Sequence, residues 1–281
     1  MKLNAFPLNY FKQIWTPSKL FAERRELNVF QLFLIIVFLT SLMIVPVSIH
    51  YATLDSFPME GTFKESYQLV DDSVVQKMEQ MQITDGQLEG PAFEIEKAEG
   101  IVGAGLSSDE VETALKADNA LIFQQDAFLL KEGSKSIATV PYTKDVSFHQ
   151  AATVQAFKAE LSRQWLIQNQ AYLTGVFSLL LFAVILTINV LLVAGSALFL
   201  YLTKRSRQTS ITSYKESVSV MVSCLSLPTF AAAIIGIFRF DIITMISIQT
   251  IGMVLLLLLV YFKTQFRDAA FKKESIYTET I

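Results

Sequence analysis

Few side chains in this sequence are spaced as a catalytic site requires. Glu94 and Glu96 alternate in a predicted strand and would share one face, and paired carboxylates can hydrolyse glycosidic bonds. The surrounding segment is so rich in acidic residues that such a pair carries little information. Residues 100–105 read GIVGAG, but no lysine follows them as a phosphate-binding loop requires. We interpret that run as a turn.

Metal and nucleophile chemistry has equally little support. His50 and His149 lie far apart, and the single cysteine, Cys224, lies inside an apolar run, so neither a disulfide within the chain nor a zinc pattern can form. No His-Glu-x-x-His, Gly-x-Ser-x-Gly or Walker pattern occurs. We predict no catalytic, metal or cofactor site and expect a protein that is not an enzyme.

The elements that carry these residues are dominated by long apolar runs. Of the 281 residues 52% are hydrophobic and 17% are charged, against about 25% charged in soluble domains. The runs predict transmembrane helices at 29–49, 172–202, 218–238 and 242–262. The first run, at 1.5 Å per residue, would extend about 31 Å, enough to cross a hydrocarbon core. A cleaved signal peptide is the alternative for it, but 28 residues precede the run.

Basic residues orient the predicted spans. Segments 1–28, 203–217 and 263–281 carry five, four and four Lys or Arg residues, which favours the cytoplasm for all three. The short loop 239–241 and the long segment 50–171 would then lie outside. We predict a multi-pass membrane protein whose amino and carboxyl termini are cytoplasmic.

Segment 50–171 is predicted to be an acidic α+β domain. It holds 19 Asp or Glu and 9 Lys or Arg residues, which makes it unsuited to nucleic acid or an anionic lipid surface. Apolar spacing predicts one helix face, made by Tyr67, Val70, Val74, Met78 and Met81. Strands are expected at 93–96, 120–123, 127–131 and 137–142, and a helix capped by Ser107 and Glu110. A last helical pattern begins at Ser147 and is expected to continue into the second span.

Segment 1–28 interleaves aromatic and basic side chains, which favours one or two interfacial amphipathic helices broken near Thr16-Pro17. A docking site for a cytoplasmic partner is the alternative.

No charge falls inside the predicted spans, and their polar residues are explained by helix packing. Asn189 and Gln249 are the first candidates for a polar pathway.

The amino-terminal segment also carries a family resemblance. Its pattern is Phe6-Pro7-x-x-Tyr10-Phe11-Lys12-x-Ile14-x-x-Pro17-x-x-Leu20-Phe21, followed by Arg24-Arg25-Glu26-Leu27. It resembles a poorly characterised family of bacterial four-span membrane proteins, some of them named maltodextrin (maltodextrose) utilisation proteins. The resemblance implies a bacterial cell membrane and a link to maltodextrin uptake or its regulation. It supplies no catalytic or ligand residues.

We therefore expect a non-enzymatic accessory or regulatory membrane protein. Its partners would be the lipid bilayer and other membrane proteins, with a sugar-uptake system suggested by the resemblance and no nucleic acid. A small permease subunit acting as a homo-oligomer is the alternative, and an extracytoplasmic ligand sensor is the third hypothesis.

Overall fold

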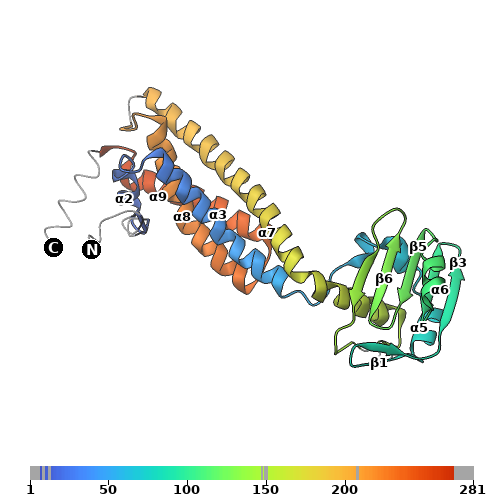
Figure 1. Ribbon diagram of the computed structural model, residues 1–281. Helices are drawn as coiled ribbons and strands as arrows, with labels where there is room; N and C mark the ends of the chain where they lie inside the picture. Colours follow the sequence, from blue (N-terminus) through green and yellow to red (C-terminus); the bar gives the residue numbers. More distant parts are fainter. Residues whose placement is uncertain are drawn as a thin grey trace. The chain divides into compact units, whose positions relative to one another are not determined.

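The computed structural model describes residues 7, 10–11, 14–146, 148, 151–206 and 209–268. The chain forms two compact units (Figure 1): unit 1 comprises Met1–Ala52 and Thr174–Ile281, and unit 2 comprises Thr53–Leu173. Unit 2 is thus inserted after the first long helix of unit 1.

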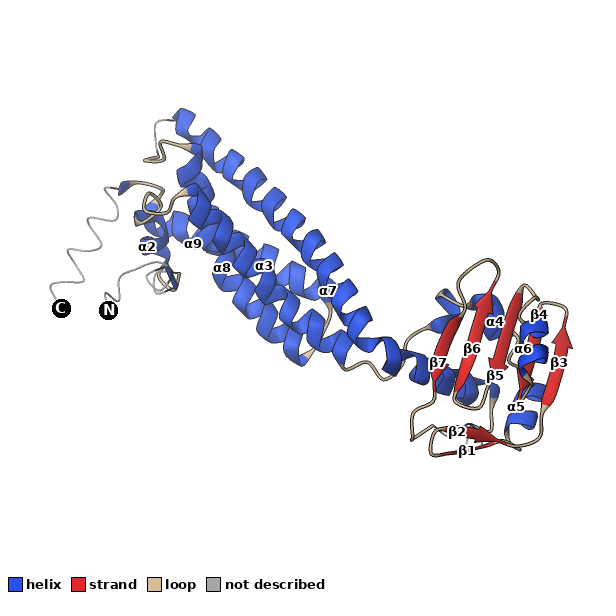
Figure 2. Cartoon of the chain, in the orientation of Figure 1, coloured by secondary structure: helices blue, strands red, loops and turns tan. Residues whose placement is uncertain are grey.

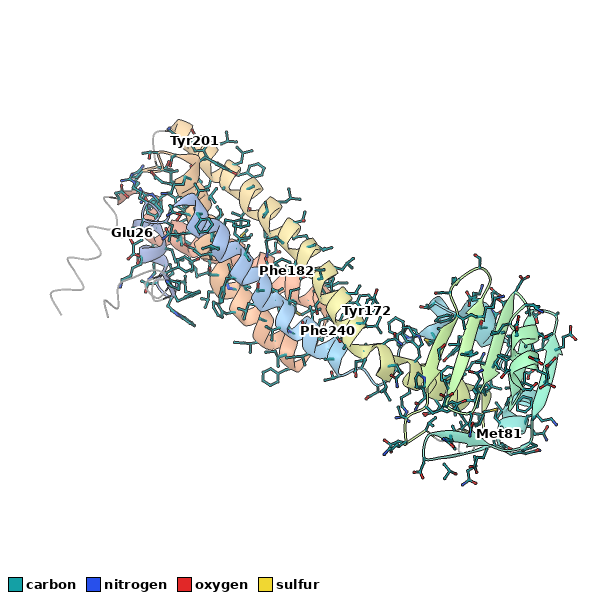
Figure 3. All side chains as sticks on the ribbon, viewed as in Figure 1. Glu26, Met81, Tyr172, Phe182, Tyr201 and Phe240 are labelled. Atoms are coloured by element: carbon teal, nitrogen blue, oxygen red, sulfur yellow. The ribbon has the colours of Figure 1, made fainter. Side chains whose placement is uncertain are left out.

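Long helices make up most of unit 1. They are α3 (Val29–Ala52), α7 (Val154–Leu202, whose first part belongs to unit 2), α8 (Tyr214–Phe238) and α9 (Ile242–Thr264), with η3 (Thr203–Ser206) after α7. All four long helices are long and apolar enough to cross a membrane. In the part that belongs to unit 1, α7 carries many exposed apolar side chains. Figure 3 labels Phe182 and Tyr201 on this part of the helix. Such exposure suits a lipid environment.

Polar caps set where these helices begin. Asn28 and Gln31 cap α3 reciprocally, with side-chain to backbone hydrogen bonds of 2.8 and 2.9 Å. Ser213 caps α8, and Asp241 accepts a hydrogen bond from the Ile243 amide at the start of α9. Each cap satisfies a backbone donor that the helix itself leaves unpaired.

Small residues set how closely α8 meets its neighbours. A Cβ atom on Gly252 of α9 would lie 2.7 Å from the Cβ of Pro228 on α8. One on Gly236 of α8 would lie 2.6 Å from the sulfur of Met245 on α9 and 3.1 Å from the Cβ of Pro46 on α3. Both prolines, which interrupt the hydrogen bonding of their own helices, therefore lie against a glycine of a neighbouring helix.

The amino-terminal segment packs onto this bundle. Helix α2 (Pro17–Ala22) begins at the proline where we predicted a break, and it contacts α8 and α9. Tyr10, Ile14, Leu20 and Phe21 are buried in the same core as residues of α3, α8 and α9. Most large apolar residues of the described segment therefore face protein, while Trp15 remains exposed.

Unit 2 is an α+β fold (Figure 2). Its five-stranded sheet has the order β3-β4-β5-β6-β7, and a hairpin of β1 (Gln82–Thr84) and β2 (Gln87–Glu89) lies beside it. The strands are β3 (Phe93–Lys97), β4 (Gly100–Ala104), β5 (Asn119–Phe123), β6 (Ala127–Glu132) and β7 (Ala138–Pro141). Neighbours are antiparallel except β4 and β5, which are parallel and joined through α6 (Ser108–Ala114).

The two faces of the sheet have separate cores. Ala120 and Ile122 of β5 pack with Val111 of α6, while Leu121 and Phe123 belong to the larger core on the other face. That larger core includes residues of η1 (Met59–Gly61), α4 (Lys64–Gln68), α5 (Asp72–Met78) and the first turns of α7. The alternation follows from the two-residue period of a strand.

Several predicted elements of unit 2 are confirmed. The strands at 93–96, 120–123, 127–131 and 137–142 correspond to β3, β5, β6 and β7. The Ser107–Glu110 capping box is present at the start of α6.

Three details of the prediction were wrong. Residues 100–104 form strand β4, and only Gly105, with φ +66°, makes the turn. The predicted helix through Tyr67 and Met78 is two helices, because the Asp71 carboxylate accepts from the Ser73 and Val74 amides and starts α5 anew. Helix α7 begins at Val154; Ala151 is not helical, and Ser147 lies outside the described residues.

Candidate functional site

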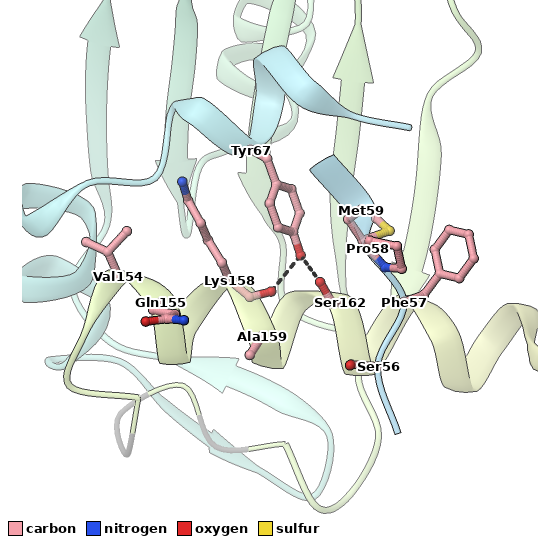
Figure 4. A pocket seen from close by; sticks show the side chains of 10 residues that line it. All are labelled: Ser56, Phe57, Pro58, Met59, Tyr67, Val154, Gln155, Lys158, Ala159 and Ser162. Atoms are coloured by element: carbon pink, nitrogen blue, oxygen red, sulfur yellow. Dashed lines mark hydrogen bonds between the residues drawn. The ribbon is translucent and has the colours of Figure 1, made fainter. Parts of the chain in front are cut away.

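A pocket of about 660 Å³ lies in unit 2 along the first turns of α7 (Figure 4). Its apolar wall comes from Phe57, Pro58, Met59, Val154 and Ala159. Ser56, Gln155, Lys158, Ser162 and the hydroxyl of Tyr67 supply polar groups. A mostly apolar wall with a few polar groups is typical of small-molecule sites of 300–1,000 Å³.

Tyr67 fixes the geometry of this pocket. Its hydroxyl donates to the backbone carbonyl of Lys158 at 2.6 Å, and because that uses its only proton, the Ser162 hydroxyl donates to it, also at 2.6 Å. The Tyr67 ring is buried in the core of unit 2. Tyr67 therefore holds α4 against the α7 turns that carry Lys158 and Ser162.

A second polar feature is a charged cluster in unit 1, which we call the clasp: Arg24, Arg25, Ser210, Glu216 and Asp268. The Arg24 side chain is 1% exposed and contacts the carboxylates of Glu216 at 3.1 Å and Asp268 at 2.9 Å. It also donates to the Ser210 and Phe21 carbonyls and lies over the Phe21 ring. A buried guanidinium with all these partners is well satisfied.

The clasp joins three distant segments of the chain. Arg25 repeats the contacts to Glu216 and Asp268 from a position 54% exposed, and the Asp268 amide donates to the Ser210 hydroxyl at 3.0 Å. The segment before α3, the one before α8 and the one after α9 thus meet at this cluster.

Glu23, beside the clasp, is poorly accommodated. Its Oε2 atom is buried and has no hydrogen-bond partner among the described residues. Burial, and to a lesser extent the neighbouring Glu26, raise the pKa of Glu23 to about 6.

The two candidates for a polar pathway are paired within the bundle. The Asn189 amide donates to the Thr40 hydroxyl at 3.0 Å, and the Gln249 amide donates to the Thr229 hydroxyl at 2.8 Å. All four side chains are buried. This arrangement is typical of polar pairs between packed helices.

The sequence-derived chemical candidates do not come together. Glu94 and Glu96 are exposed on β3, and Cys224 is buried in α8. Among the described residues no three His, Cys, Asp or Glu side chains are grouped as metal ligands. The pocket and the clasp were not anticipated, because both depend on contacts between residues distant in sequence.

The family of the chain follows from comparison with known proteins. The family described as "Protein of unknown function (DUF1189)" matches residues 11–264. The chain belongs to the DUF1189 family. The expected family resemblance is thus confirmed.

Two bacterial relatives align with the chain over almost their whole length. "Maltodextrose utilization protein MalA" of Streptococcus pneumoniae is 30% identical over 276 residues, 95% of this chain and 99% of that protein. "Putative maltodextrin utilization protein YvdJ" of Bacillus subtilis is 28% identical over 264 residues, 90% of this chain and 88% of that protein. No solved structure matches this DUF1189 chain.

Proposed function

We propose that this DUF1189 protein is a non-enzymatic accessory or regulatory membrane protein of maltodextrin utilisation. The names of two relatives that cover nearly the whole chain support the link to maltodextrin. The four long apolar helices support a multi-pass membrane protein. The excess of Lys and Arg in segments 1–28, 203–217 and 263–281 supports cytoplasmic termini, with unit 2 outside.

The observation that carries an accessory role is the clasp. It builds one folded surface from three segments that the charge pattern assigns to the cytoplasm. In the amino-terminal segment Trp15 is 68% exposed, and Arg25 of the clasp is 54% exposed. Exposed tryptophan and arginine are enriched at the centres of protein interfaces. The protein would act by binding another membrane protein through this surface.

Site-specific photo-crosslinking tests this role in native membranes. A benzophenone amino acid at Trp15 is expected to give adducts with subunits of the maltodextrin-uptake system, identified by mass spectrometry. The matched control places the same group at Ile137, an exposed apolar residue of unit 2. Deletion of the gene should also lower maltodextrin uptake.

Two outcomes would contradict the proposal. Adducts formed only with a second copy of the chain, together with maltodextrin flux in liposomes containing this protein alone, would favour an oligomeric permease. Unchanged uptake and transporter assembly after deletion would remove the accessory role altogether.

A further inference from the structure

Five of the nine basic side chains of unit 2 are paired or hydrogen-bonded, and three others, Lys77, Lys116 and Lys144, are exposed. Lys64 lies 4.0 Å from the Glu65 carboxylate. Lys97 pairs with Asp71 at 2.6 Å, Lys135 with Glu132 at 2.9 Å and Arg163 with Glu160 at 2.8 Å. Lys131 donates to two backbone carbonyls beyond the end of α6. Half-buried Lys158 differs, because its ammonium group makes no ion pair or hydrogen bond within the described part of the chain.

Lys158 lines two cavities at once. Besides the 660 Å³ pocket, it lines a cavity of about 280 Å³ together with Lys64, Tyr67 and Gln68. Neither lining contains a carboxylate, although acidic residues outnumber basic ones 19 to 9 in segment 50–171. The cavities are therefore a local site of positive charge in an acidic domain, which favours an anion.

We propose that these cavities bind a phosphate ester of a polyol, either as a free small molecule or as a lipid headgroup. The phosphate would lie between Lys158 and Lys64, since lysine binds phosphate as a point charge. At pH 7 a free phosphomonoester carries about −1.5 to −2 and the phosphodiester of a lipid headgroup about −1. The pocket is too large for phosphate alone. Ser56 and Gln155 supply hydrogen bonds for hydroxyl groups, and Phe57 and Met59 supply apolar surface for the carbon skeleton.

The fluorescence of Trp165, which packs beside the pocket, can report on binding there. The Trp165 ring packs against Phe57, with ring centroids 5.5 Å apart, and Phe57 lines the pocket. The only other tryptophan is Trp15. A Trp15→Phe background therefore leaves fluorescence from Trp165 alone.

The test uses the full chain with Trp15→Phe in nanodiscs of neutral phosphatidylcholine. Titration with glycerol 3-phosphate is expected to change Trp165 emission saturably and more weakly at high salt. Lys158→Gln should raise the Kd about tenfold or more, because a charge-assisted contact is lost. Lys158→Arg should keep much of the affinity. Lys116→Gln, which removes an exposed lysine away from the pocket, should bind normally.

A second arm separates the two sources of the phosphate. If free glycerol 3-phosphate leaves the Trp165 emission unchanged, but nanodiscs containing phosphatidylglycerol shift it in a way that depends on Lys158, the ligand is a lipid headgroup. Equal responses of the parent chain and Lys158→Gln to both probes would overturn the proposal. So would saturable binding of neutral maltotriose in place of either phosphate, independent of Lys158. Unchanged thermal unfolding of Lys158→Gln would verify that the variant is folded.

Discussion

At the scale of single residues, burial decides what a charge does in this molecule. Arg24 and Arg25 are adjacent and contact the same two carboxylates, yet their exposed fractions are 1% and 54%. Lys158 and Lys97 both belong to unit 2, yet Lys97 pairs with Asp71 and Lys158 has no such pair among the residues that the structure describes. Neither difference can be inferred from residue type or spacing.

Glu23 gives a pH prediction at this scale. In the folded protein the pKa of Glu23 is about 6, above the usual value of about 4.3, so ionisation of this carboxyl disfavours the folded state. The protonated carboxyl therefore contributes stability below about pH 4.3, and this contribution is lost as the pH rises through 6. Glu23→Gln should therefore stabilise the protein at pH 7, by at most about 1 kcal/mol after solvent screening, and have little effect at pH 4.

Thermal unfolding in detergent at the two pH values measures this effect. Glu79→Gln, which changes an exposed carboxylate of unit 2, is the control. A Glu23→Gln gain that is equal at pH 4 and pH 7 would contradict the assigned cause.

At the scale of elements, the sequence predicted those helices and strands whose position is determined by a local pattern of residues. The charge-free runs gave the starts of α3 and α9, because Asn28 and Asp241 cap these helices directly before the runs. Helix α8 begins at Tyr214, four residues before the predicted 218, because its cap is Ser213 and its first turn includes charged residues. The break between α4 and α5 was missed because it depends on one side chain, Asp71, outcompeting a continuous apolar period. Tyr10 was assigned to an interface because nothing local reveals its hydrogen bond to Ser226, 216 residues away.

Substitution of two helix glycines by alanine should have opposite effects on the stability of the protein. Gly252→Ala places a Cβ 2.7 Å from Pro228 and should cost about 1–3 kcal/mol, because the α8–α9 contact must open. Gly195→Ala on α7 meets no atom within 4 Å and should be neutral or stabilise by up to about 1 kcal/mol. Thermal unfolding of the two variants in one detergent provides the comparison, and a Gly252→Ala protein as stable as Gly195→Ala would rule out tight packing there.

At the scale of the whole molecule, the clasp closes unit 1 by joining segments from both ends of the described chain. Arg24→Met should cost about 3–5 kcal/mol, because Glu216 would remain buried and partly uncompensated. Arg25→Met should cost about 1 kcal/mol or less, because Arg25 is exposed. Thermal unfolding in detergent and abundance in membranes both report the difference.

A double variant tests whether the stability lost in Arg24→Met comes from the buried charge of Glu216. Arg24→Met with Glu216→Leu should recover part of the stability that Arg24→Met loses, since an apolar pair leaves no buried charge. Equal losses in the Arg24 and Arg25 variants would show that the clasp is an ordinary surface ion-pair network.

The clasp also has a consequence for how the protein is made. The ribosome synthesises Arg24 192 residues before Glu216, and Asp268 follows later still. Until the last of these residues emerges, the guanidinium lacks carboxylates that it needs for burial. The amino-terminal segment, although translated first, is therefore expected to reach its final position last. A chain stopped after α9 but before Asp268 should leave that segment open to protease.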